Sequence, residues 1–127
     1  MIVLTKFFLK SELKTLKNKV GLSDVFEGVK RIDKDLGISI KVSCNFQNLR
    51  FFKVRVGKLV KARMIVFLRI DSSKYVPIVL RLKKDKVFGM NMSMNNKVLA
   101  DLLKANFEKI IEDLEKGDFE EFDLKDL

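Results

Sequence analysis

The chain has 127 residues, of which 47% are hydrophobic, and it carries a formal net charge of +9. This length predicts one domain with one core, and the hydrophobic content excludes a wholly disordered chain. No apolar run reaches the roughly 18 residues of a membrane-spanning helix, and Lys6 interrupts the apolar start. We therefore expect neither a membrane segment nor a signal peptide.

Two residue types narrow the function further. The chain has no histidine, the commonest general acid/base and metal ligand, so we expect no metal, no cofactor and no histidine-dependent catalysis. Cys44 is the only cysteine, which excludes an internal disulfide and favours a reducing compartment, the cytoplasm.

The N-terminal part predicts a short strand and two helices. Residues Ile2 to Thr5 suit an edge strand, and Thr5 suits the N-cap of a helix that continues to about Lys19 with leucines at helical spacing. Ser23 can cap a second helix, which Gly37 closes. These two helices would form an N-terminal helical hairpin.

From residue 38 onward, apolar and polar residues alternate, which predicts strands. The alternation covers residues 38–42, 52–56, 63–68 and 76–83. Pro77 should lie near the start of the last strand or at an edge. A third helix is expected from Lys97 to about Glu115, followed by an acidic C-terminal tail over residues 116–127.

Together these elements predict a single α+β domain over residues 1–115. Its N-terminal helical hairpin would pack on a small, mainly antiparallel twisted sheet, and a C-terminal helix would complete the domain.

The charge is unevenly distributed along the chain. Residues 1–100 contain 22 Lys and Arg against 7 Asp and Glu, a net charge of +15, whereas residues 101–127 contain 4 against 10, a net charge of −6. No acidic residue occurs between Asp35 and Asp71, while basic residues recur along the predicted strands. This pattern predicts a polyanionic partner, and the acidic tail is expected either to be solvated or to cover the basic groove.

The order of these elements, with basic residues on the strands, resembles the RelE/ParE family of toxins from bacterial toxin–antitoxin systems. Three phrases carry the resemblance: TKFFLKSELKTLKNK at the first helix, FFKVRVG followed by KARMIVF in the middle strands, and VLRLKKDK at the end of the last strand. The resemblance covers roughly residues 1–95. It implies a RelE-like fold and a cognate antitoxin protein as partner.

For function, the resemblance implies a metal-independent endoribonuclease that cleaves mRNA, commonly on the ribosome, by activating the 2′-hydroxyl against the adjacent phosphodiester. Carried over by position, Lys53 and Arg55 would activate the substrate, Arg63 would stabilise phosphate charge, and Lys84 or its neighbour Lys83 would lie near the leaving-group acid. Further RNA contacts would come from Lys61, Arg81, Lys83, Lys86 and Phe51.

One position differs from the family. Where members have a tyrosine shortly after the last strand, this chain has GMNMSMNN, and its single tyrosine, Tyr75, lies in the preceding hairpin. A ring for base stacking could come from Phe51 or Phe88 instead. Two alternatives to the ribonuclease stay open: a ParE-like poison of DNA gyrase, and a non-catalytic RNA-binding domain whose affinity falls steeply with salt.

Overall fold

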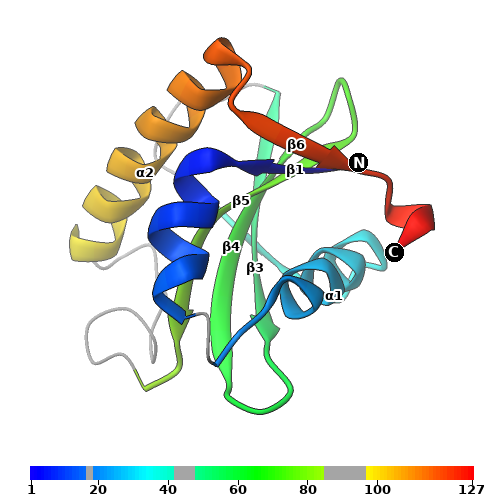
Figure 1. The fold of residues 1–127 in the computed structure, drawn as a ribbon, viewed down its shortest axis with the longest axis vertical. Helices are drawn as coiled ribbons and strands as arrows, with labels where there is room; N and C mark the ends of the chain where they lie inside the picture. The colour runs from blue at the N-terminus through cyan, green and yellow to red at the C-terminus, as the bar shows by residue number, and fades with distance from the viewer. Residues whose placement is uncertain (17–18, 42–47, 85–96) are drawn as a thin grey trace.

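A computed structural model describes residues 1–16, 19–41, 48–84 and 97–127. Their strands form one six-stranded sheet in the order β2-β3-β4-β5-β1-β6 (Figure 1). The sheet is mixed, because β1 runs parallel to β5 and all other neighbours are antiparallel. Its strands are β1 (Ile2–Thr5), β2 (Ile38–Ile40), β3 (Leu49–Val56), β4 (Ala62–Arg69), β5 (Lys74–Leu82) and β6 (Phe119–Phe122).

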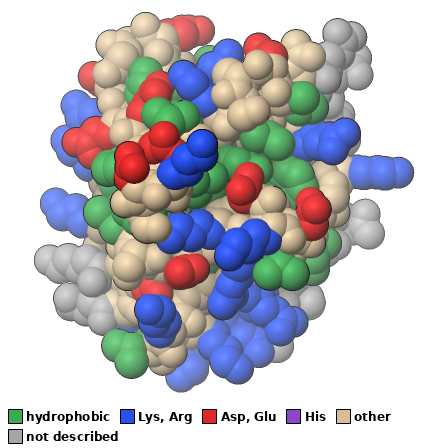
Figure 2. All heavy atoms as spheres, turned by 90° about the vertical axis from the view of Figure 1, so that its right-hand side faces the viewer, with side chains coloured by type: hydrophobic (Ala, Val, Ile, Leu, Met, Phe, Trp, Pro, Cys, Tyr) green, Lys and Arg blue, Asp and Glu red, His purple; other side chains and the backbone are tan. Residues whose placement is uncertain are grey.

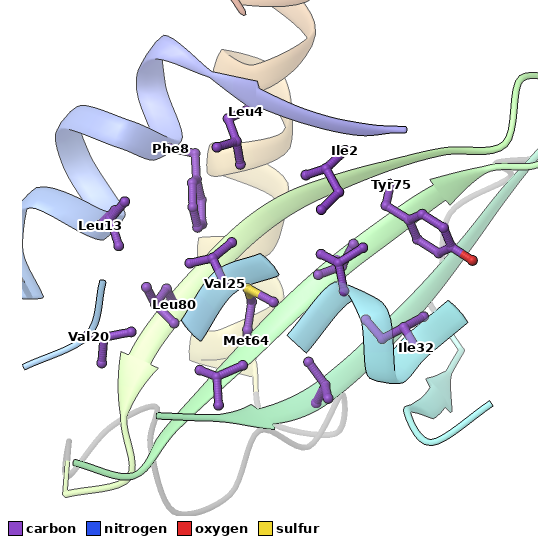
Figure 3. Packing of buried hydrophobic residues seen from close by; sticks show 14 of the residues in the cluster. Ile2, Leu4, Phe8, Leu13, Val20, Val25, Ile32, Met64, Tyr75 and Leu80 are labelled. Carbon is purple, nitrogen blue, oxygen red and sulfur yellow. The ribbon is translucent and has the colours of Figure 1, made fainter. Parts of the chain in front are cut away.

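Helices cover both faces of this sheet (Figure 1). One face packs against the π-helical turn η1 (Phe8–Leu13), which continues into the 3-10 turn η2 (Lys14–Leu16), and against α1 (Leu22–Asp33). Figure 3 shows this layer, with the labelled side chains of both helical segments pointing toward the strands. The other face packs against α2 (Lys97–Lys116), and a last 3-10 turn, η3 (Leu124–Asp126), follows β6.

Helix α1 is fixed to the sheet at two places. A Cβ at Gly28 would lie 2.5 Å from Val56 Cγ1 and 2.7 Å from Met64 Cε, so only glycine allows the helix to approach this closely. Toward the C-terminal end of the helix, the hydroxyl of Tyr75, a largely buried residue, donates a partly buried hydrogen bond to Asp33 Oδ1 at 2.9 Å. Burial, more than the neighbouring carboxylate, raises the pKa of Tyr75 to about 12.

A bulge in β5 explains how the strand tolerates its proline. Ile65 and Val66 on β4 pair with Val79 and Pro77, which leaves Ile78 as the extra residue of the bulge. The carbonyl of Ile78 accepts a 3.1 Å hydrogen bond from the side-chain amide of Asn106, a buried residue of α2. Pro77 was expected near a strand start or an edge, and it instead lies in an inner strand next to a bulge.

The predicted arrangement of a helical hairpin first and one helix last is wrong, although the α+β class holds. The chain begins with the expected strand, but β1 is an inner strand and not the predicted edge strand. Its four residues are all buried, because both faces of the sheet are covered here. Over residues 8–16, the expected first helix is a short π and 3-10 stretch and not a continuous α-helix. Helix α2 is followed by β6, because β1 has a second edge that needs hydrogen-bond partners.

The strands and the last helix of the sequence analysis are otherwise present. Alternation placed Val54 and Val56 on one face of β3 and Phe51 on the other, as the two core clusters show. The helix expected from Lys97 is present as α2. The acidic segment, expected as a tail, contributes Phe119–Phe122 to the sheet as its edge strand.

The Tyr75 hydroxyl gives a direct test of this packing, because the chain has one tyrosine and no tryptophan. We expect the near-ultraviolet tyrosinate absorbance of the folded protein to titrate near pH 12 and that of the unfolded chain near pH 10. A raised folded-state pKa stabilises the fold below pH 10, and this contribution should be lost as the pH rises to about 12. Asp33→Asn should lower the folded-state value, whereas a wild-type titration near pH 10 would contradict the partly buried hydrogen bond.

The bulge predicts a stability cost at Asn106. Asn106→Ala removes the donor to the Ile78 carbonyl and leaves that buried acceptor unsatisfied, so we expect the free energy of unfolding to fall by about 2 kcal/mol. Urea denaturation measures this loss, and Lys104→Ala at an exposed site on the same helix is the control. Equal stability of the two variants would show that the amide is not needed by the bulge.

Candidate nucleic-acid interface

The strands β3, β4 and β5 extend beyond their neighbours at one end of the sheet. Strand β2 pairs with β3 only as far as Lys53, and β1 pairs with β5 at its beginning, near Tyr75. The three strands then continue toward the turn that joins β3 to β4 (Figure 1). We call this extension the basic end; it comprises residues 53–63 and 80–84.

Three arginines form a row across the basic end. Arg55 pairs directly with Arg63, and Arg63 pairs directly with Arg81. Directly opposed residues point to the same face of a sheet, and neighbouring strands lie about 4.8 Å apart, so the row spans about 10 Å. Lys53, two residues before Arg55, belongs to the same face.

Glu12, on η1, closes one side of this row. Its carboxylate is buried, with 3% of the side chain exposed, and its two oxygens bind different groups. Oε1 accepts the backbone N–H of Leu80 at 2.9 Å, and Oε2 accepts Arg81 Nη2 at 3.0 Å. Glu12 thus supplies the hydrogen bond that β1 would supply if it extended this far, and it neutralises the third arginine of the row.

Arg31, on α1, closes the opposite side. Its Nη1 donates a 3.0 Å hydrogen bond to the backbone carbonyl of Arg55, beyond the point where β2 ends. A charged side chain therefore occupies the exposed edge of β3, as Glu12 does for β5. The same contact adds a fourth guanidinium near the row.

Arg55 and Arg63 carry their charges without an acidic partner. Within the described ranges, neither has an Asp or Glu oxygen at salt-bridge distance. The ion pairs between described residues are Arg81–Glu12, Lys74–Glu121 and Lys116–Glu112. Burial, and secondly the positive charge of Arg55, lowers the pKa of Arg63. Like charges directly opposed on adjacent strands destabilise a sheet, so a bound anion would relieve this repulsion.

The turn between β3 and β4 adds more cations at the same end. Gly57 has a φ of +100°, and a Cβ there would lie 2.0 Å from the carbonyl oxygen of Val60, so the turn requires glycine. Lys58 and Lys61 on either side of the tip are exposed. Figure 2, which shows the right-hand side of Figure 1, has Lys and Arg side chains gathered over its lower right part.

The structure brings most of the predicted site residues together. Lys53, Arg55, Arg63 and Arg81 share one face, and Lys83 N–H donates to the Lys61 carbonyl at 2.9 Å, which holds these two residues at the end of the row. Lys84 follows them and is exposed. Lys86, Phe88 and Cys44 lie outside the described residues.

Phe51 has a different environment from the one expected of a base-stacking ring. It is buried, with 4% exposed, and its ring centroid lies 5.9 Å from that of Phe67 and 6.2 Å from that of Phe107. The ring therefore belongs to the core between the sheet and α2.

Two residues of the site were missed from the sequence. Glu12 is the only acidic residue before Asp24, and a single carboxylate among lysines and leucines was a usable sign of a specific contact. Arg31 gave no comparable sign, because it looks like one of several cations on an exposed helix face.

Comparison of the chain with protein-family models, with curated proteins and with solved structures finds no match. Among the described residues, no three His, Cys, Asp or Glu side chains gather in a way that could hold a metal ion. No helix in the same part of the chain is long and apolar enough to cross a membrane.

The opposed pair Arg55 and Arg63 predicts that Arg63→Gln stabilises the folded protein. Removing one of two opposed like charges should raise the free energy of unfolding by about 0.5 kcal/mol at low salt, and the gain should shrink at about 1 M salt as screening increases. Arg50→Gln is the matched control, because Arg50 is an exposed β3 residue that opposes Leu68, not a cation. A loss of stability specific to Arg63→Gln at low salt would contradict the repulsion.

Proposed function

We propose that this protein binds nucleic acid, with RNA as the first candidate, through contacts between the basic end and the phosphodiester backbone. The observation that carries the proposal is that Arg55 and Arg63 lie directly opposite each other on adjacent strands and have no acidic partner in the described structure. A bound polyanion would balance these two positive charges and so stabilise the folded protein.

The spacing of the row suits phosphate groups. Guanidinium groups bind phosphate oxygens through two parallel hydrogen bonds, and side chains on adjacent strands start about 4.8 Å apart. Arg55 and Arg63 can therefore share one phosphate or hold two successive ones. Lys61 and Lys83, at the end of the row, extend the track of positive charge.

Binding requires only the positive charge of the row, whereas cleavage by 2′-hydroxyl attack also requires a general base and a general acid. Lys53, Arg55 and Lys84 stay the predicted candidates for substrate activation and proton transfer. Glu12 does not suit the role of the base, because its carboxylate already accepts hydrogen bonds from Leu80 and Arg81. Among the described residues, the predicted stacking ring Phe51 lies in the core, so the contacts proposed for this row are to phosphate and should show little sequence preference.

The more specific functions implied by the family resemblance stay predictions. These are messenger RNA cleavage, action on the ribosome, control by an antitoxin, poisoning of gyrase and a cytoplasmic location. Incubation with RNA separates the first from simple binding, because a ribonuclease of this type leaves fragments with 2′,3′-cyclic or 3′-phosphate ends.

The proposal predicts a salt-dependent affinity for single-stranded RNA. Fluorescence anisotropy with a labelled uridine oligomer should give a log–log plot of affinity against salt with a negative slope, to which each phosphate contact contributes about 0.7. Arg63→Gln should weaken binding several-fold and make the slope shallower by about 0.7, whereas Arg50→Gln should change both much less.

A wild-type protein without salt-dependent binding to RNA would overturn the proposal. If a DNA oligomer of equal length bound more tightly than the RNA, the backbone contact would stand but the choice of RNA would be wrong. Binding unaffected by Arg63→Gln would place the interface elsewhere on the molecule.

A further inference from the structure

We propose that Glu12 limits the strength of nucleic-acid binding by withholding Arg81 from the phosphate backbone. The row then presents two arginines to the ligand in place of three. This inference rests on the proposed function and concerns the regulation of the same surface.

The position of Glu12 supports this role. The carboxylate is buried, yet it lies at the margin of the row, where the Arg81 side chain remains 29% exposed. A buried charge of this kind requires a charged, hydrogen-bonded partner, and Arg81 supplies it at 3.0 Å. The Leu80 N–H holds the second oxygen at 2.9 Å, so Glu12 cannot turn away from the strand without leaving a buried backbone donor unsatisfied.

The neighbours of Arg81 show what this pairing changes. Arg81 is directly opposite Arg63, which is itself opposite Arg55. If Glu12 carried no charge, the positive charge of Arg81 would not be balanced, and the row would be less stable but more attractive to an anion. Glu12 therefore stabilises the sheet and lowers its affinity for phosphate at the same time.

A purely structural role for Glu12 makes a different prediction. If the carboxylate served only to close the edge of β5, its neutral replacement would lower stability and leave the RNA affinity of the folded protein unchanged. Stability alone cannot separate the two roles. The salt dependence of binding can, because it reports the number of phosphates that are neutralised.

The test uses Glu12→Gln, which keeps an oxygen for the Leu80 N–H but removes the charge that neutralises Arg81. We expect the folded variant to bind the labelled uridine oligomer several-fold more tightly than wild type, with a slope steeper by about 0.7. Glu121→Gln is the matched control: it also breaks an ion pair, with Lys74 at 2.9 Å, but lies on β6 and should leave the slope unchanged.

The double variant Glu12→Gln/Arg81→Gln keeps the net charge of wild type and keeps the test valid if the single variant does not fold. In wild type the charge of Glu12 balances that of Arg81, and the double variant removes both charges. Its salt slope should therefore equal that of wild type. Loss of about 0.7 from its slope would show that Arg81 already contacts phosphate, and would overturn the inference.

An unchanged slope and affinity in folded Glu12→Gln would also overturn it. These outcomes differ from failure of the proposed function, in which wild type itself shows no salt-dependent binding.

Discussion

The structure depends on how three strands end beyond the neighbours that pair with them. Strands β3, β4 and β5 continue past β2 and β1, so their outer edges expose backbone groups that a longer sheet would satisfy. Glu12 accepts the free N–H of Leu80 on one side, and Arg31 donates to the free carbonyl of Arg55 on the other. Both edges are closed by side chains from the helices that pack on the sheet.

This way of closing the edges fixes where charge can accumulate. Because β4 lies between the two closed edges, its Arg63 has arginines opposite it on both neighbouring strands, and only Arg81 has an acidic partner in the described structure. Helices cover the central part of the sheet on both faces. The proposed binding surface therefore follows from the lengths of the strands.

Alternation in the sequence was sufficient to predict the middle strands and the basic stripe of β3, which carries Lys53 and Arg55. It did not predict that Arg55 pairs directly with Arg63, because Arg63 shares its stripe with Ile65 and Phe67 and the pairing depends on the register set by the turn at Gly57. Helix α2 was equally predictable from its apolar stripe. These features depend on local periodicity, which a single sequence records.

The features that could not be predicted depend on distant partners. Strand β6 has the pattern FEEF, which does not alternate, and it forms because β1 offers an open edge. The pairing of Glu12 with Arg81 joins residues 69 positions apart, and nothing near Glu12 in the sequence specifies the partner. The bulge at Ile78 depends on Asn106, 28 positions later. The predicted arrangement of the first helices failed for the same reason, since a short β1 followed by a π turn is what brings Glu12 to β5.

We propose that the basic end, and not α2 or β6, contacts the phosphate backbone. The most direct measurement is a backbone amide NMR titration with a short uridine oligomer, repeated at high salt. We expect salt-sensitive shift changes at residues 53–63 and 80–84, with α2 and β6 unaffected. Shift changes confined to α2 and β6, or spread evenly over the molecule, would contradict the claim.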